Sequence, residues 1–321
     1  MLVVPAPAKI NLALEVVRRR PDGWHDIESV VVPIDWHDLI GLELRDAAHD
    51  VRVSGPASEG VPGALGAPPA ADNLAVRAAD ALTATAAGNG DAGDAMPRPL
   101  RVWVHKRVPA GAGLGGGSAD AAAVLRAASR LTRQAGAGLG STQISALAAL
   151  LGSDVPALLA RTTVHVTGRG ERLAEIDAPP LHLVIAFLGP SSTRDAYEAL
   201  RPEEMSDGSR VRALIAALTG VSAETGGEPI NLPPPADGLL GSALEAPALR
   251  LIAPLAVSAQ RLRDSTAPRS WHMTGSGGAF FAMARDAVDA AALAQQVREE
   301  GLLARACRTL SASPLRPDIS R

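Results

Sequence analysis

The stretch that decides the fold is Pro109-Ala-Gly-Ala-Gly-Leu-Gly-Gly-Gly-Ser-Ala-Asp-Ala-Ala-Ala123, with five glycines between Gly111 and Gly117. It follows a strand-like run, Leu100–Val104, and opens into an alanine-rich segment, 118–131, that is typical of a helix. Glycine lets the backbone approach a ligand closely, and a helix start offers unpaired N–H groups and a positive dipole end. The stretch therefore predicts a cradle for the phosphates of a nucleotide, with Ser118 or Asp120 as the helix cap.

Two familiar phosphate loops fit this stretch poorly. Gly111-x-Gly113-x-x-Gly116 matches the dinucleotide fingerprint, which also needs a second strand ending in Asp or Glu about 20 residues on. Here the chain runs through Gly136–Gly140 into another helical segment instead. A P-loop needs Gly-Lys-Ser/Thr at its end, whereas Gly117-Ser118-Ala119 has no lysine. The loop must therefore take its positive charge from elsewhere in the chain.

Composition narrows the class of protein. A chain of 321 residues fits two domains or one large one, and 47% apolar residues suffice for a core. The net charge of −3 gives no electrostatic case for nucleic acid, and the single cysteine, Cys307, cannot form an internal disulfide. We find neither a signal-peptide pattern nor an apolar run of about 18 residues. We expect a cytoplasmic protein with no nucleic-acid or membrane partner, and the sequence leaves its oligomeric state open.

Lysine is scarce in this chain. Lys9 and Lys106 are the only two lysines among 31 basic residues, so the sequence is strongly biased toward arginine. Lysine is a compact point charge on a flexible stem, whereas the arginine guanidinium is a planar fork. Both lysines also fall beside chemically suggestive motifs, which favours functional roles over chance survival.

Four motifs together resemble the GHMP kinases, which are small-molecule kinases named for galactose, homoserine, mevalonate and phosphomevalonate. Besides the glycine loop they are Pro7-Ala-Lys-Ile-Asn-Leu-Ala-Leu14, Asp22-Gly-Trp-His-Asp26 and Leu151-Gly-Ser-Asp-Val-Pro156. In this order they are similar to the diphosphocytidyl-methylerythritol kinase family, most densely between Val4 and Leu173. The resemblance implies ATP-dependent phosphorylation of a tertiary 2-hydroxyl in the non-mevalonate isoprenoid pathway.

The resemblance also implies a fold and a division of the chain. It predicts a two-domain α+β fold, with an N-terminal domain like ribosomal protein S5 domain 2 and a ferredoxin-like C-terminal domain. We place the ATP-binding domain at 1–178 and a second domain that contributes to the substrate site at 179–321. The cofactors implied are ATP and Mg²⁺, although no carboxylate cluster in the sequence identifies the metal ligands.

Lys9 and Asp154 match the family's catalytic pair. Asp154 is expected to accept the proton of the alcohol, and Lys9 to keep that carboxylate ionised and balance charge on the moving phosphoryl group. Without the resemblance, Asp154 would be interpreted as an ordinary loop aspartate. Lys9 could be a surface lysine, although its position in an apolar strand argues against full solvation. The remaining ATP-binding residues that we expect are Asn73, Leu74, Lys106, Pro109, Ala110, Gly111, Ala112, Gly113, Leu114, Gly115, Gly116, Gly117 and Ser118.

The substrate site is expected to read a cytosine. Trp24 and His25 match a family Tyr-His pair in which the aromatic ring stacks on cytosine and the histidine reads its polar edge. Tyr197 falls where the family often has an aromatic that covers the other face of the base. Asn11 shares a strand face with Lys9 and could bind the hydroxyl or phosphate of the substrate. Asn73 could equally be only a helix cap.

Departures from the family pattern lie mostly in the second half of the chain. They are Arg161-Thr162 in place of Gly-Gly, Ser242 in place of Asn, and the doubled Gly277-Gly278. These departures concern details of the second domain and leave the phosphoryl-transfer residues intact. Two other functions stay open. One is another GHMP kinase, of homoserine or mevalonate type, to which a cytosine reader would be useless. The other is an inactive nucleotide-binding regulatory homologue, against which the presence of both Lys9 and Asp154 speaks.

Local patterns predict the remaining elements. The expected strands are 9–17, 29–34, 39–44, 51–53, 162–167, 182–187, 271–274, 279–284 and 304–310. The expected helices are 73–85, 141–151 capped by Ser141, 193–200, 209–218, 248–262 and 286–300. The Gly/Pro-rich segment 219–241 is expected to be irregular.

Overall fold

A computed structural model describes residues 1–45, 50–57, 72–88, 99–134, 139–225 and 237–310, and every structural statement below concerns these residues. The chain divides by compactness into two units, which are described separately. Unit 1 is Met1–Ala8, Trp36–Ala110 and Gly115–Ala160, and unit 2 is Lys9–Asp35, Gly111–Leu114 and Arg161–Arg321. This division interleaves segments of the chain, so the domain boundary near residue 178 stays a prediction. Within the described ranges, no helix is long and apolar enough to cross a membrane.

Two long strands run through both units. They are β1 (Leu2–Arg19) and β2 (His25–Leu44), and the sheet that contains them has the strand order β3-β4-β2-β1-β8, with β5 and β6 joined to β2. The prediction of separate strands at 29–34 and 39–44 was wrong. Because Ile27–Val31 pairs with β5 and Leu39–Leu44 pairs with β4, the chain stays extended between them. The fixed φ of Pro33 is compatible with that extended backbone.

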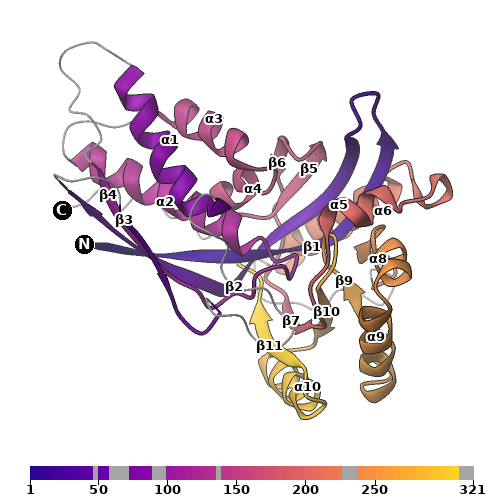
Figure 1. The fold of residues 1–321 in the computed structure, drawn as a ribbon. Helices are drawn as coiled ribbons and strands as arrows, with labels where there is room; N and C mark the ends of the chain where they lie inside the picture. The colour runs from indigo at the N-terminus through magenta and orange to yellow at the C-terminus, as the bar shows by residue number, and fades with distance from the viewer. Residues whose placement is uncertain (46–49, 58–71, 89–98, 135–138, 226–236, 311–321) are drawn as a thin grey trace. The chain divides into compact units, whose positions relative to one another are not determined.

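Unit 1 is a helical layer on short strands. Its elements are β3 (Asp50–Ser54), β4 (Leu100–His105), α1 (Leu74–Gly88), α2 (Gly116–Gln134), α3 (Ser141–Leu151) and α4 (Val155–Ala160). Helix α2 packs against the other three helices, which gather around it in Figure 1. Its inner face is almost entirely alanine, from Ala119 to Ala128, and these small side chains are buried in the core of the unit. Small side chains allow close helix packing, which holds the start of α2 firmly in place.

Unit 2 contains a second sheet, which is antiparallel. Its strand order is β11-β7-β10-β9, made of β11 (Leu303–Arg308), β7 (His182–Phe187), β10 (Ala279–Ala284) and β9 (His272–Met273). Phe280 and Phe281 of β10 are fully buried. The other strands are β5 (Val164–Gly168), β6 (Arg172–Glu175) and β8 (Gly241–Ser242). The helices are α5 (Thr193–Glu198), the 3₁₀ turn η2 (Pro202–Glu204), α6 (Ser209–Thr225), α8 (Glu245–Leu251), α9 (Ala253–Ser265) and α10 (Ala287–Glu299). Helix α10 covers β7 and β11 (Figure 1).

Two predicted elements of unit 2 need correction. The single helix expected at 248–262 is two helices, α8 and α9, separated at Ile252. Pro254 stands in the first turn of α9, where its missing N–H costs nothing. Helix α6 runs on to Thr225 rather than ending at Leu218, so part of the segment predicted to be irregular is helical. The remainder of that segment at 226–236 lies outside the described residues.

Two predicted helix caps were also wrong. Helix α2 begins at Gly116, where the N–H of Ala119 bonds to the carbonyl of Gly115, so neither Ser118 nor Asp120 is its cap. The N-cap of α3 is Gly140 rather than Ser141, and the side chain of Gln143 accepts a hydrogen bond from its N–H at 2.9 Å. The capping box is therefore half formed, by the glutamine alone. In contrast, Asn73 caps α1 as predicted, since its Oδ1 accepts the N–H of Ala75 at 2.9 Å.

Candidate active site

Lys9 and Asn11 form a buried polar pair on one face of β1, as their spacing predicts. Both side chains are only 4% exposed, and the Nζ of Lys9 donates to the Oδ1 of Asn11 at 2.7 Å. The amide of Asn11 donates in turn to Ser29 Oγ on β2, and that hydroxyl donates to the carbonyl of Ala13, both at 2.7 Å. This chain of bonds fixes the Asn11 amide orientation, so its Oδ1 faces the ammonium group. The ammonium is thereby held in a dry site where its charge acts strongly.

The glycine loop lies directly against a second glycine loop, 275–278. A Cβ atom on Gly113 would lie 2.5 Å from the carbonyl oxygen of Gly277, and one on Gly278 would lie 2.7 Å from that of Gly111. A Cβ on Gly275 would lie 3.2 Å from Asn11 Oδ1. The doubled glycine that departs from the family pattern thus has a physical reason, because two backbones meet with no room for side chains.

Gly115 offers a direct test of the glycine loop, since its φ is +67°. We expect Gly115→Val to weaken binding of an ATP analogue while the protein stays folded, because a branched residue resists positive φ and blocks backbone approach. Gly140→Ala, at an ordinary φ of −66°, is the matched control. Calorimetric titration measures both variants, and unchanged affinity in folded Gly115→Val would contradict the phosphate cradle.

Lys106 is buried beneath the start of α2, between two carboxylates. Its side chain is 6% exposed, and its Nζ donates to Asp38 and, at 2.8 Å, to Asp120 Oδ2. The other oxygen of Asp38 accepts the N–H of Val108 at 2.8 Å. A Cβ on Gly116 would lie 3.4 Å from the ammonium. Whether Lys106 also contacts ATP stays a prediction, but these bonds tie the glycine-loop end of α2 to β2.

Asp120 is the carboxyl of this cluster whose pKa is raised. Burial raises its pKa to about 8, against the opposing pull of Lys106 and with a further increase from Asp38. The two carboxylates raise the pKa of Lys106 although burial lowers it. Two carboxylates share one ammonium, so a proton on Asp120 removes one uncompensated negative charge. Its Oδ1 is the buried side-chain polar atom without a partner among the described residues.

Stability should therefore depend on pH through Asp120. A carboxyl whose folded pKa exceeds its unfolded value contributes stability below about pH 4, and loses it as pH rises toward 8. We expect the unfolding free energy of Asp120→Asn to rise relative to wild type across that window, by at most about 1.4 kcal/mol per pH unit. Denaturant unfolding from pH 5 to 9 measures it, and parallel pH profiles for the two proteins would contradict it.

The two residues expected near adenine lie close to the start of α2. Asn73 is buried as the cap of α1, and Leu74 follows it as the first helical residue. A Cβ on Gly117 would lie 3.9 Å from Leu74 Cδ1. The structure thus brings Leu74 and Gly117 together, although they are distant in sequence. Adenine binding by Asn73 and Leu74 itself stays a prediction.

Asp154 stands at the entrance of α4. It is half-buried, and its carbonyl accepts the N–H of Leu158 at 3.1 Å. Val155 and Pro156 begin this helix. The guanidinium of Arg126 on α2 donates to the carbonyl of Leu158 at 2.9 Å and ties the helix to its neighbour. The backbone that carries Asp154 is therefore fixed on both sides.

The hairpin between β1 and β2 carries the residues expected to read the base. Trp24 is 54% exposed at its tip, which fits a ligand-facing residue better than a core residue. His25 stacks on Tyr197 of α5 with ring centroids 5.0 Å apart and planes at 29°. Burial, and then the charge of Arg19, lowers the pKa of His25, so its ring is neutral at physiological pH. The structure thus brings His25 and Tyr197 together.

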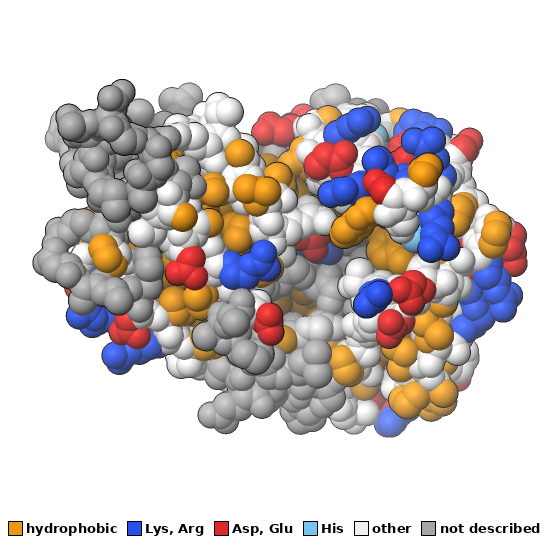
Figure 2. Space-filling view, turned by 45° about the horizontal axis from the view of Figure 1, so that its top comes forward, with side chains coloured by type: hydrophobic (Ala, Val, Ile, Leu, Met, Phe, Trp, Pro, Cys, Tyr) orange, Lys and Arg blue, Asp and Glu red, His pale blue; other side chains and the backbone are white. Residues whose placement is uncertain are grey.

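Most of the charge at this hairpin is internally paired. Arg18 donates to Asp26, and Arg20 donates to both Asp22 and Asp26. Basic and acidic side chains are interspersed at close range on the face drawn in Figure 2. These pairs stiffen the turn that presents Trp24, although exposed ion pairs contribute little to stability.

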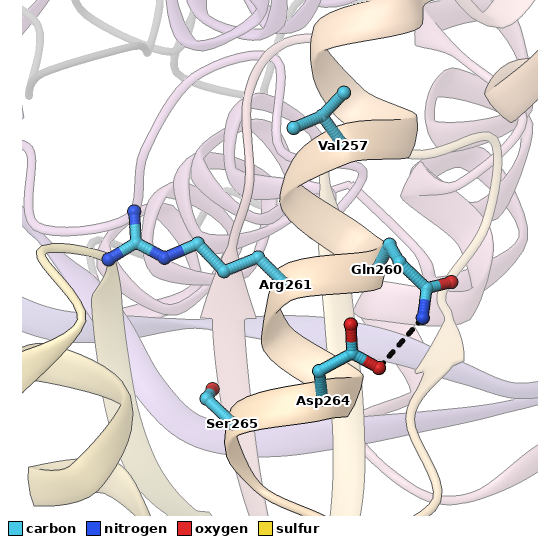
Figure 3. Close-up of a pocket in the computed structure, with 5 residues that line it drawn as sticks. All are labelled: Val257, Gln260, Arg261, Asp264 and Ser265. Carbon is cyan, nitrogen blue, oxygen red and sulfur yellow. Dashed lines mark hydrogen bonds between the residues drawn. The ribbon is translucent and has the colours of Figure 1, made fainter.

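A shallow pocket lies on α9 (Figure 3). It is lined by Val257, Gln260, Arg261, Asp264 and Ser265. Gln260 donates to Asp264 at 2.8 Å, one turn further along the same helix. Within the described part of the chain, no group of three or more His, Cys, Asp or Glu side chains could hold a metal ion.

The sequence did not indicate which residues hydrogen-bond to Asn11 and Lys106 and hold them in place. Ser29 holds Asn11 and the hydroxyl of Thr274 accepts the N–H of Asn11 at 2.7 Å, while Asp38 holds Lys106. Asp38 offered one signal, because an aspartate within an apolar strand pattern must find a partner when buried. At a second departure the structure explains the glycine of the family rather than the arginine of this chain, since Arg161 has a φ of +58°, where glycine costs less.

Comparisons with known proteins show the family of this chain. Residues 73–161 match the model of the GHMP kinases N-terminal domain. A 4-diphosphocytidyl-2-C-methyl-D-erythritol kinase of Anaeromyxobacter dehalogenans is 37% identical, over 94% of this chain and 87% of its own length. One from Thermus thermophilus is 35% identical, over 92% of both chains.

Solved structures give the same assignment. A crystal structure of 4-(cytidine 5'-diphospho)-2C-methyl-D-erythritol kinase superposes with a TM-score of 0.72 at 34% identity, covering 96% of this chain and 99% of that one. Streptococcus pneumoniae phosphomevalonate kinase superposes at 0.61 with 12% identity, covering 97% and 99%, and shares the fold alone. The predicted α+β GHMP kinase fold is therefore confirmed, and the chain belongs to the 4-diphosphocytidyl-2-C-methyl-D-erythritol kinase family of the GHMP kinases.

Proposed function

We propose that this chain transfers the γ-phosphate of ATP to the tertiary 2-hydroxyl of 4-diphosphocytidyl-2-C-methyl-D-erythritol. This reaction belongs to the non-mevalonate pathway to isoprenoid precursors. The proposal rests on the presence, in one chain, of a kinase glycine loop and of a hairpin that presents Trp24 and His25. The chain is also 34–37% identical to 4-diphosphocytidyl-2-C-methyl-D-erythritol kinases. Other GHMP kinases have no use for a cytosine reader.

The proposed chemistry needs a proton acceptor, charge neutralisation and positioning. Asp154 takes the proton of the 2-hydroxyl as that oxygen attacks the γ-phosphorus of ATP. The bond between the γ-phosphorus and the oxygen that bridges it to the β-phosphate breaks, and ADP leaves. Lys9 stabilises the negative charge that develops on the transferred group, from a buried position where charge is weakly screened. The N–H groups of residues 113–118, at the start of α2, cradle the phosphates of ATP.

We expect a magnesium ion to accompany ATP. Magnesium usually reaches kinase sites on the phosphates, with one or two protein carboxylates. The described residues offer no cluster that would cage it, so we assign no protein ligand and derive no step through the metal. We likewise expect the protein to act in the cytoplasm on a freely diffusing substrate.

The proposed base site is built from the hairpin and α5. Trp24 stacks on one face of cytosine, and Tyr197 covers the other once the base displaces it from His25. His25 is neutral, so one of its ring nitrogens can accept a hydrogen bond from the edge of the base and the other can donate one to it. Asn11, held by Ser29 and Thr274, contacts the methylerythritol end of the substrate.

Trp24→Ala tests the base site. We expect the KM for the cytidine substrate to rise about ten- to a hundredfold, because stacking on a base contributes about 1–3 kcal/mol. The affinity for ATP should stay unchanged, since adenine lies in a separate pocket near Asn73. His25→Ala should instead reduce discrimination between CDP and UDP as competitors. If neither nucleotide competes with the substrate in wild type, the base site is wrong and the alcohol is unknown.

The turnover and competition assay also distinguishes two other functions. A homoserine or mevalonate kinase would turn over its own alcohol and ignore CDP, and the likeness to a homoserine kinase structure, at 16% identity, shows only the fold. A regulatory homologue would bind nucleotide without turnover.

A further inference from the structure

Arg169 lies over the indole of Trp24. Its Cζ atom is 4.8 Å from the centroid of the ring, within the range of a cation–π contact. Arg169 belongs to the turn between β5 and β6, and Trp24 to the turn between β1 and β2. The two turns are neighbours because β5 pairs with β2, with Gly168 opposite Ile27.

Both turns hold their side chains in defined places. The N–H of Arg169 donates to Glu171 Oε2 at 2.6 Å, and Gly168 and Gly170 take positive φ on either side. On the other turn, the carbonyl of Trp24 accepts the N–H of Arg20 at 2.7 Å, and the N–H of Trp24 donates to Asp22 Oδ1 at 3.2 Å.

A second observation places the guanidinium against this hairpin. The pKa of Asp22 is lowered chiefly by its bond with Arg20, and the charge of Arg169 adds to that effect. Arg169 therefore lies over the ring of Trp24, and its charge also acts on the carboxylate of Asp22. Arg18 and Arg20 are already bonded to Asp26 and Asp22, so Arg169 is the cation placed on the ring.

We propose that Arg169 positions Trp24 for the nucleobase, by covering one face of the indole and leaving the opposite face for stacking. Trp24 is 54% exposed with the guanidinium over its ring, so a large part of the residue stays accessible to a ligand. A planar guanidinium stacks on an aromatic ring and restricts its rotation, which reduces the entropy lost when the base binds. This inference rests on the proposed function, because it assigns a positioning residue to the cytosine site.

The test is calorimetric titration with CDP, followed by UDP and an ATP analogue. We expect Arg169→Ala to weaken CDP and UDP by the same factor, about three- to tenfold, because the contact orients the ring and reads no base edge. Arg169→Lys should retain part of the affinity, since it keeps the charge but loses the planar stack. In turnover, KM for the cytidine substrate should rise while kcat and the affinity for ATP stay unchanged.

Arg172→Ala is the matched control. Arg172 lies on the same hairpin, is 77% exposed and pairs with Glu171, so its removal takes away one charge and no ring contact. We expect its CDP affinity to equal that of wild type. An equal loss for Arg172→Ala and Arg169→Ala would show a general charge effect and overturn the proposal.

The double variant Trp24→Ala/Arg169→Ala decides whether Arg169 acts through the ring. We expect no further loss beyond that of Trp24→Ala, because the guanidinium then has no ring to orient. A full additional loss, or tighter CDP binding by Arg169→Ala alone, would overturn the inference while leaving the proposed function intact. Wild-type protein that fails to bind CDP would overturn both.

Discussion

Asp154→Asn should lower kcat by about 10²–10⁴-fold while the affinities for an ATP analogue and for CDP stay within twofold. The amide nearly matches the carboxylate in shape, but it cannot take the proton of the alcohol. The backbone at this residue is fixed by its bond to Leu158 and by α4, so the substitution should not move it. Steady-state kinetics and calorimetry measure the two effects separately.

A charge control separates this role from a general effect of removing a carboxylate. Asp80→Asn removes a charge from the exposed side of α1 and should leave kcat unchanged. If Asp154→Asn loses less than a few-fold in kcat, Asp154 is structural and the rate arises from positioning alone. A loss of nucleotide affinity equal to the loss of kcat would instead indicate a misplaced loop.

Lys106→Met should lower the free energy of unfolding by about 3–5 kcal/mol. The substitution removes the ammonium from between Asp38 and Asp120 and leaves two buried carboxylates without their common partner. Methionine fills a similar volume, so the loss reports charge rather than a cavity. Denaturant unfolding at pH 7 measures the change.

The partners of Lys106 provide the internal check. Adding Asp120→Asn to Lys106→Met should recover part of the lost stability, because the buried Asp120 carboxyl must take up a proton on folding at pH 7, whereas an amide is already neutral. Loss below about 1 kcal/mol in Lys106→Met would mean that the cluster is hydrated and that Lys106 does not fasten α2. In that case a direct contact of Lys106 with ATP would become the better explanation.

The local sequence predicted the glycine loop and most elements well. Strand alternation placed Lys9 and Asn11 on one face of β1, and the structure joins them by a hydrogen bond. The exposure of Trp24 is in keeping with the Pro21-Asp-Gly23 turn that precedes it. These features depend on residues two to five positions apart, over which backbone geometry is nearly fixed by residue type.

Features set by distant residues could not be predicted in the same way. Lys106 meets Asp38 across 68 residues, and Asn11 meets Thr274 across 263. The length of β2 depends on its pairing with two different strands, β4 and β5. A local sequence pattern does not indicate such pairing. The contact of the two glycine loops could not be predicted either. Glycine is required there only because the two backbones lie against each other, and the sequence alone does not show that they do.

Turnover with a panel of alcohols tests the central claim most directly. The purified protein is incubated with ATP and, separately, with 4-diphosphocytidyl-2-C-methyl-D-erythritol, homoserine, mevalonate and phosphomevalonate, and ADP release is followed together with the phosphorylated product. The account predicts stoichiometric phosphorylation of the cytidine-linked alcohol alone, at its tertiary hydroxyl, and inhibition of that reaction by CDP. Phosphorylation of another alcohol in the panel, with none of the cytidine-linked one, would contradict it.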